Sequence, residues 1–584
     1  MEWLIVLASC AAFSLIAVMW SWRNDALLNY GDAVAHLNIA RRVFDCHQPR
    51  FSQLGSVWLP LPHILLIPFV QVYSWWATGL AAVLPSSLAY LAACAGIYRL
   101  ARHWLSPAVA ALALAFFAIN PNLLYLQTTA MTEPLFLSEM IWITVLLVEW
   151  RTGLDADPKR TSRLLWGIAL LLVAAVFTRY DGWIMALLAW TAIGLTLARR
   201  GELRSRAFWL ASVLVVAAPV AWFIYNAAAF GDWLYFARGP YSAKAIEIRT
   251  AVPGYPPHPG WHDPWVGFLF YMKAAEMDAA AAAWGNVLLV LSLVGGVWAW
   301  LAAGRRLVGW TLLLALPVPF YAYSVAYGSV PIFIPVWWPH SWYNLRYGLE
   351  LLPAFALGLG FAAEVLFAAM HQFKPHAGQA KWVYYSAALL FSVVGLNAYR
   401  MLRERPLVYV EGTKNIQAHR PYELAIPPVL RALLAGRPGG VLLTITSIDP
   451  EIIALTGIPL RQTINESDLE IYRDALTAPA AHAALVLAFD GDEVDNAVRH
   501  HPAGLTVYRR FSAPGQPSAT IYVSDTPNAS ILNNHAGRVI ASLQESSTTM
   551  APASLSESFH FDGADSRARP GTGKLFTLRD PEDD

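Results

Sequence analysis

The sequence predicts a polytopic α-helical membrane protein of about eleven spans, followed by a small extracytoplasmic α/β domain. Composition is the first indication: 57% of the 584 residues are apolar and 14% are charged, against roughly 25% charged in a typical soluble protein. The second is the distribution of charge, which is markedly denser after residue 400 than before it. The net charge of +1 argues against nucleic acid as a partner, because such proteins need a basic surface.

Apolar runs of spanning length, separated by Lys or Arg, give the expected membrane helices. They lie at 3–22, 86–102, 107–126, 133–150, 164–178, 182–198, 207–228, 285–303, 307–328, 346–370 and 382–399. The first run has no basic segment before it, so we interpret it as an anchor rather than a signal peptide. The apolar segment 60–82 is interpreted as a helix in the outer interface, because one more span would place the basic loops outside.

Basic residues set the expected orientation of the chain. Five loops, at 99–106, 150–163, 199–206, 304–306 and 371–381, hold 14 Lys and Arg residues. By the positive-inside rule these loops are cytoplasmic. An odd number of spans then places the amino terminus in the cytoplasm and the carboxy-terminal part outside it. We expect an integral protein of the bacterial inner membrane, in contact with the lipid bilayer.

Three domains are expected along the chain. Residues 1–400 form the membrane domain, 401–526 a soluble extracytoplasmic α/β domain, and 527–584 a disordered tail rich in Ser, Thr and Asn. Within the soluble domain, apolar strand-like runs alternate with helix-like stretches. The strands are expected at 441–448, 484–493, 506–512 and 519–525, and the helices at 423–435, 466–478 and 492–500. The acidic piece FDGDEVD (489–495) lacks the ligand spacing of a calcium loop and is interpreted as a strand-to-helix turn.

Ionisable residues gather at the outer ends of the expected spans and in the three long outer regions, 23–85, 229–284 and 329–345. They are Asp32, His36, Glu133, Arg179, Asp181, Lys244, His340 and Arg346. The outer regions are also rich in Trp, Tyr and Pro. An aromatic belt at the lipid boundary, together with loop-forming Pro, would account for this composition without any function. The ionisable residues predict a polar cavity that faces outward.

Asp32 is the most informative of these positions. It opens an amphipathic helix, expected to lie flat on the outer interface, with His36 one turn further on. A plain alternative is that Asp32 only caps this helix. The other positions have structural alternatives too: Glu133 complements a helix dipole, Arg179 and Asp181 pair across a turn, and Arg346 snorkels to the interface.

The order of several segments resembles the GT-C fold glycosyltransferases, and more narrowly the protein O-mannosyltransferase and aminoarabinose-transferase branch. These are GDAVAHLNIARRVFD, the proline-marked WLPLPHILLIPF, the stretch from SSLAYLAACAG to TTAMTEPLFL, and YNLRYGLELLPAF. The resemblance covers residues 1–230 well and the later spans loosely. It implies a polyprenyl-phosphate-linked sugar as donor and an active-site role for Asp32. The sequence departs from the branch at Ala33, where a second acid is common.

The resulting hypothesis is a membrane glycosyltransferase that transfers a sugar to a hydroxyl of a protein, lipid or glycan, with inversion. Asp32 would accept the proton of the acceptor hydroxyl. Cations would bind the departing phosphate of the donor, namely Arg346, Lys244 and Arg238. His36, Glu133, Asp181 and His340 are candidate substrate-binding residues. No His, Cys or Asp set has metal-ligand spacing, so no metal ligands and no cofactor are assigned, and the need for a divalent metal is left open.

Two other classes of protein fit parts of the pattern. A lipid or solute transporter, such as a flippase, would line its path with intramembrane charges. However, the charges here lie at outer span ends, and the sequence shows no duplicated halves. A scaffold protein would use the α/β domain to bind a partner.

Overall fold

The structure is a computed structural model that describes residues 2–154, 157–251, 254, 256–282, 284–302, 309–373 and 379–525. The chain divides into two compact units. The membrane unit comprises Met1–Arg41 and Leu54–Ile416, and the carboxy-terminal unit comprises Arg42–Gln53 and the chain from Gln417 onward. The expected tail, 527–584, lies outside the described residues.

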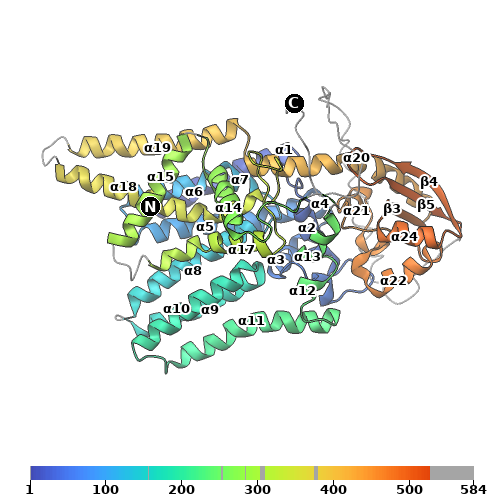
Figure 1. Cartoon of the computed structure of the whole chain (residues 1–584), viewed down its shortest axis with the longest axis horizontal. Helices are drawn as coiled ribbons and strands as arrows, with labels where there is room; N and C mark the ends of the chain where they lie inside the picture. Colours follow the sequence, from blue (N-terminus) through green and yellow to red (C-terminus); the bar gives the residue numbers. More distant parts are fainter. Residues whose placement is uncertain are drawn as a thin grey trace. The chain divides into compact units, whose positions relative to one another are not determined.

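Helices occupy each of the eleven expected spans (Figure 1). They are α1 (Glu2–Arg23), α5 (Leu80–Ala101), α6 (Pro107–Ala118), α8 (Glu133–Gly153), α9 (Pro158–Thr178), α10 (Asp181–Arg199), α11 (Arg206–Phe230), α15 (Trp284–Ala302), α17 (Pro317–Tyr327), α18 (Leu352–Phe373) and α19 (Gln379–Arg403). Among the described residues, 7 helical segments are long and apolar enough to cross a membrane. The predicted class, a polytopic helical membrane protein with a carboxy-terminal α/β domain, is confirmed.

Some expected spans are interrupted or charged. The run 107–126 breaks at Asn120, whose side chain caps α7 (Pro121–Leu126) by accepting hydrogen bonds from two backbone amides of that helix. Helix α8 carries Glu133, Glu139 and Glu149, all buried. Acidic residues buried in a membrane helix need partners inside the protein, so α8 points to a polar interior.

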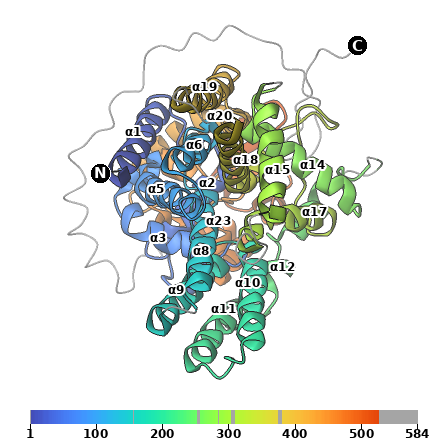
Figure 2. The ribbon, with the colours of Figure 1, turned by 90° about the vertical axis from the view of Figure 1, so that its left-hand side faces the viewer.

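Close helix packing in the membrane unit depends on glycine. Helices α15 and α18 contact each other along their length. A side chain at Gly358 would collide with the carbonyl oxygen of Ser292, and one at Gly295 would collide with that of Gly358. Such small residues let helix backbones approach within a membrane. Figure 2 shows α9, α10 and α11 grouped to one side of the other membrane helices.

The first outer region folds into short helices, α2 (Gly31–Arg42), α3 (Leu61–Val70) and α4 (Tyr73–Thr78). With 10 residues, α3 is about 15 Å long, too short to cross a bilayer. Helix α2 differs from its expectation, because its polar side is buried as well as its apolar side. Asn38 accepts a hydrogen bond from Trp76, and Arg41 donates to the carbonyl of Val70. Helices α3 and α4 therefore provide hydrogen-bond partners for polar side chains of α2 that the sequence pattern had predicted to face water.

The second and third outer regions also contain helical segments. They are α12 (Tyr235–Arg238), α13 (Ala243–Thr250), α14 (Pro264–Ala279) and the 3-10 segment η3 (Leu345–Leu351), with a further 3-10 segment η2 (Gly309–Ala315) before α17. Helix α14 packs against α17 and η3. These contacts hold the start of η3, which carries Arg346, inside the membrane unit.

The carboxy-terminal unit contains a five-stranded sheet in the order β2-β1-β3-β5-β4. The strands are β1 (Leu442–Leu443), β2 (Thr463–Ile464), β3 (Leu485–Phe489), β4 (Leu505–Phe511) and β5 (Ala519–Ser524). Strands β2, β1 and β3 are parallel, whereas β5 is antiparallel to both of its neighbours. The apolar core of this unit includes Leu443, Val486 and Val494. Strand β1 is much shorter than the expected 441–448.

Helices flank this sheet at the expected places: α20 (Leu407–Ala435), α22 (Glu470–Thr477) and α24 (Glu493–His500), with the shorter α21 (Ile452–Thr456) and α23 (Pro479–His482). Asp492 caps α24 by accepting a hydrogen bond from the amide of Asp495, as expected for a strand-to-helix turn. The two units divide within α20, at Ile416, rather than at residue 400. The unit also includes Arg42–Gln53, where the buried Asp45 accepts hydrogen bonds from the amides of Leu460 and Arg461.

Candidate active site

Arg346 is the centre of a buried ionic network in the membrane unit. Its Nη2 lies 2.6 Å from Asp32 Oδ2, its Nε 3.1 Å from Glu133 Oε1, and its Nη1 2.9 Å from Glu411 Oε1. The Arg346 side chain is 5% exposed. The guanidinium therefore faces three carboxylates inside the protein and does not snorkel to the interface.

Asp32 differs from the other carboxylates of this network in its exposure. Its side chain is 44% exposed, whereas those of Glu133 and Glu411 are 1% and 5% exposed. Its Oδ2 accepts a hydrogen bond from Arg346, so a helix-capping role alone does not describe it. Asp32 is the carboxylate through which this network meets solvent.

A tight turn before η3 aims Arg346 at Glu411. Asn344 has a φ of 57°, in the left-handed region that Asn tolerates better than most residues. Its backbone amide donates to Glu411 Oε1, at 2.8 Å, and its side chain donates to the carbonyl of Pro331. The amide of Arg346 also points to Glu411, with Oε2 at 3.4 Å. One carboxylate on α20 therefore fixes both the turn and the guanidinium.

Arg179 forms a second centre beside the first. Its guanidinium lies 3.4 Å from Glu133 Oε1, 3.2 Å from Asp181 Oδ2 and 3.1 Å from Glu350 Oε1. It also donates a hydrogen bond to the hydroxyl of Tyr321, at 2.6 Å. Arg179 and Asp181 do pair, as one alternative held, but the pair belongs to a larger network. Glu133 links the two arginines.

The network holds more acid than base. Its two arginines face five carboxylates, those of Asp32, Glu133, Asp181, Glu350 and Glu411. Burial raises the pKa of Glu411 above its usual range, although Arg346 acts in the opposite direction. Buried carboxylates favour the neutral form unless a cation compensates them. The network is therefore suited to hold a proton or to attract a further cationic group.

Tyrosine rings support the two guanidinium groups. The Arg346 guanidinium lies 5.2 Å from the ring centre of Tyr30 and 5.0 Å from that of Tyr347. Arg179 lies 5.1 Å from the Tyr347 ring. Arginine stacks well on aromatic faces, which restricts its rotation as well as stabilising its charge. The rings therefore fix the planes of both arginines.

His36 lies in α2, one turn after Asp32, but points away from solvent. Its Nδ1 is 2.8 Å from His63 Nε2, and its ring contacts that of Trp58. Burial lowers the pKa of His36 to about 4. A neutral His36 joined to α3 anchors the first turns of α2, so it holds Asp32 in position.

The remaining candidates are divided between interior and surface. Glu133 and Asp181 are buried at the two arginines. His340 is exposed and hydrogen-bonds with the carbonyl oxygen of Pro335. In the long outer loop, Arg238 ends α12 and is exposed, and the 58%-exposed Lys244 lies 2.5 Å from Glu247. The exposed candidates are therefore accessible from solvent, whereas the buried ones contact Arg346 or Arg179.

Two acidic members of the network were missed from the sequence. Glu350 follows Arg346 within an apolar span, and an ionisable residue in a span is itself a sign of function. Glu411 lies in the apolar piece VYVEG, which had been assigned to the soluble domain. A lone acid in such a run predicts a buried partner, but no local pattern identifies Arg346 as that partner.

The metal question left open by the sequence concerns the carboxylates around Asp32. Asp32, Glu133 and Glu411 all converge on Arg346, so the positive charge between them belongs to the guanidinium. We therefore assign no metal to these three residues.

No protein family model and no curated protein matches this sequence. Solved structures do match its fold. ArnT from Cupriavidus metallidurans bound to undecaprenyl phosphate aligns with a TM-score of 0.56 at 14% identity, covering 91% of this chain and 99% of that one. The apo oligosaccharyltransferase of Archaeoglobus fulgidus aligns with a TM-score of 0.50 at 12% identity, covering 91% and 75%. The fold predicted from the resemblance, that of GT-C membrane glycosyltransferases, is thus confirmed.

Proposed function

We propose that this protein is a membrane glycosyltransferase that moves a sugar from a polyprenyl-phosphate-linked donor to a hydroxyl of a protein, lipid or glycan acceptor. The observation that carries the proposal is Asp32, a solvent-exposed carboxylate held 2.6 Å from a buried arginine. It occurs in a chain that shares the fold of an enzyme solved with undecaprenyl phosphate. The reaction takes place at the extracytoplasmic face of the bacterial inner membrane.

In the proposed reaction, Asp32 accepts the proton of the acceptor hydroxyl. The acceptor oxygen forms a bond to the anomeric carbon of the sugar, and the bond from that carbon to the phosphate oxygen breaks. One displacement inverts the configuration, and the polyprenyl phosphate leaves with the electron pair. A carboxylate that acts as a general base contributes about two to four orders of magnitude to the rate.

Cations stabilise the departing phosphate in this scheme. Lys244 and Arg238 are exposed on the outer loop, so both can approach a lipid headgroup, Lys244 by exchanging its ion pair with Glu247 for the phosphate. The Arg346 side chain is too buried to bind a phosphate through both sides of its guanidinium. It instead contributes its positive charge to the electrostatic stabilisation of the phosphate that leaves near Asp32. It also fixes Asp32 in one orientation, which positions the base.

The other candidates support this machinery. Glu133 connects Arg346 to Arg179, and Asp181 holds Arg179 from its other side. We assign both to positioning rather than to substrate contact. His340, which is exposed in the third outer region, is the candidate for contact with the acceptor or the sugar.

The decisive experiment reconstitutes the purified protein in liposomes that carry an undecaprenyl-phosphate sugar in both leaflets. Mass spectrometry follows the release of undecaprenyl phosphate, while an accessible lipid-cleaving enzyme reports any movement of the donor between leaflets. Acceptor-dependent release without movement supports the transferase. Movement without release would instead identify a flippase, which is the alternative function that intramembrane charges could serve.

The donor is identified separately by analysing lipids that copurify with the protein. A polyprenyl-phosphate sugar enriched over the bulk lipid extract is the expected result. Its sugar also defines the substrate to be used in the liposome assay.

A further inference from the structure

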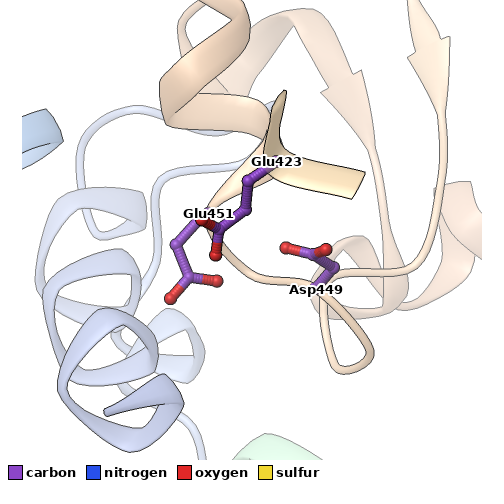
Figure 3. A group of neighbouring side chains, drawn as sticks. All are labelled: Glu423, Asp449 and Glu451. Carbon is purple, nitrogen blue, oxygen red and sulfur yellow. The ribbon is translucent and has the colours of Figure 1, made fainter. Parts of the chain in front are cut away.

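A second acidic cluster lies in the carboxy-terminal unit, apart from the network around Arg346. It consists of Glu423 on α20 and of Asp449 and Glu451, in the loop between β1 and α21. Each residue offers one carboxylate oxygen, and these oxygens all lie within 4.8 Å of one another. Figure 3 shows the Asp449 carboxylate facing the two glutamates. Three carboxyl groups from two separate chain segments thus converge on one point.

The carboxylates of this cluster are buried without the partners that buried acids normally have. The side chain of Asp449 is 0% exposed, and neither of its oxygens has a hydrogen-bond partner among the described residues. The same holds for Glu451 Oε2 and Glu423 Oε1. Buried polar groups are nearly always satisfied, so an unsatisfied set this dense points to a missing ligand.

Neighbouring basic groups do not satisfy the cluster. Arg420 Nη1 lies 3.6 Å from Glu423 Oε2, and the Arg420 side chain is 53% exposed. The Nδ1 atom of His419 is 4.0 Å from Asp449 Oδ2, beyond hydrogen-bond distance. Neither basic side chain therefore forms a hydrogen bond of normal length with the carboxylates of the cluster.

Other buried acids of the same unit provide a contrast. Glu466 accepts hydrogen bonds from the amide and hydroxyl of Thr446. Asp492 accepts from the amides of Phe489 and Asp495. The unit is therefore able to satisfy a buried carboxylate with its own donors, and the missing donors at Asp449 and Glu451 are specific to this cluster.

We propose that Glu423, Asp449 and Glu451 bind a hard divalent cation. Oxygen-only ligand sets suit Ca²⁺, Mg²⁺ and Mn²⁺, whereas Zn²⁺ prefers sites with nitrogen or sulfur ligands. The irregular placement of the three carboxylates on a helix and a loop favours Ca²⁺, which tolerates variable geometry better than Mg²⁺ does. Water would complete the coordination shell.

Such an ion would have a structural role. It would tie α20 to the loop that follows β1, two segments otherwise separated in sequence. Pro450 lies between two of the ligands and restricts the backbone that carries them. Binding to the folded state alone stabilises a protein in proportion to ligand concentration, so the ion should raise the unfolding temperature of this unit.

The test uses the full-length protein in detergent after removal of metals with EDTA. Ca²⁺, Mg²⁺ and Mn²⁺ are titrated separately by calorimetry, and thermal unfolding is followed at each concentration. One ion bound per chain, with a rise in unfolding temperature, is the expected result for Ca²⁺. Absence of saturable binding by all three ions would overturn the proposal.

Two variants, Asp449→Asn and Glu451→Gln, locate the site. Each should weaken binding by more than tenfold, because a carboxylate ligand is lost. The matched control is Asp490→Asn, which removes a partly exposed acid of the same unit that pairs with Arg510 and should leave binding unchanged. Unchanged affinity in both cluster variants would place the ion elsewhere and contradict the assignment.

The metal-free proteins give a further readout that does not depend on affinity. Without an ion, the parent holds buried carboxyl groups that lack a cation, so Asp449→Asn should unfold at the same or a higher temperature than the parent. With saturating Ca²⁺ this order should reverse. A variant that is less stable than the parent already in EDTA would show that the carboxylates are satisfied without a cation, and would refute the proposal.

Discussion

Arg346 Nη2 lies 2.6 Å from Asp32 Oδ2, although 314 positions separate the two residues in the chain. One partner is exposed and the other is buried, with side-chain exposures of 44% and 5%. This pairing joins a carboxylate that an acceptor can reach to a charge that the protein interior holds fixed.

Asp32→Asn tests the carboxylate as a base. The amide keeps the shape of the side chain but cannot take a proton, so turnover should fall by about two to four orders of magnitude. Donor binding should be largely retained, because other residues hold the phosphate. Both quantities are measured on one purified preparation. The control is Asp25→Asn, the same change at an exposed position of the same region with a φ of 50°. Parental turnover in Asp32→Asn would exclude the base role.

Arg346→Ala should reduce donor turnover more than Arg346→Lys. Alanine leaves three carboxylates without their cation, and removing one partner of a buried ion pair costs about 3 to 5 kcal/mol. Lysine restores the charge but not the three separately directed hydrogen bonds, so its activity should be intermediate. Turnover and unfolding temperature are compared in both variants. Equal activity in parent, Lys and Ala proteins would mean that the guanidinium has no part in the reaction.

Asn344 tests the turn that aims Arg346. Asn344→Val should lower stability by about 1 to 2 kcal/mol, because a β-branched residue is strained in the left-handed conformation. Asn344→Gly accepts that conformation and loses only the side-chain hydrogen bond to Pro331, so it should be milder. Unfolding temperatures give the ranking. If Gly is as harmful as Val, the side-chain hydrogen bond, and not the backbone conformation, is what matters.

His36 predicts a pH dependence of stability. Its pKa is about 4 in the folded protein because burial disfavours the charged ring, against 6.5 as the ordinary value. The unfolded state therefore binds the proton more readily. The contribution of His36 is complete above pH 6.5 and is lost as the pH falls toward 4, by about 3 kcal/mol.

His36→Asn removes the pH-dependent contribution of His36 to stability, since the amide occupies the position of Nδ1 but does not titrate. The unfolding temperature of the variant should fall less steeply than that of the parent between pH 6.5 and 4. Parallel pH profiles for the two proteins would show that the ring is not protonated on unfolding.

The orientation of the chain is tested with reporters. An enzyme that is active only in the cytoplasm should give no signal when fused after Arg405, beyond the end of α19. The same enzyme inserted into the loop 199–206 should give a strong signal, because that loop is basic. Signals in the opposite pattern would mean that the orientation of this part of the chain is inverted, and equal signals at both sites would mean that the number of spans between them is even.

The sequence by itself determined the architecture of the membrane unit. Apolar run length and the placement of Lys and Arg led to the eleven helical ranges, because a helix must satisfy its backbone within the bilayer regardless of its neighbours. The alternation of strands and helices after residue 400 could also be predicted from the sequence, because the periodicities of strands and helices are local. Asp32, Arg346, Glu133 and Arg179 were recognisable as charges at the ends of apolar runs.

The tertiary structure decided which of these charges meet. No sequence spacing relates Asp32 to Arg346, or Arg346 to Glu411, because the helices that carry them are brought together by packing between distant segments. It also decided that His36 is buried against His63 while Asp32 stays exposed, although both belong to one helix. Burial depends on what covers each side of α2, and α3 and α4 cover the side that the helical pattern alone assigned to water. Local patterns fix the elements, whereas the pairing and burial of charges follow from long-range packing.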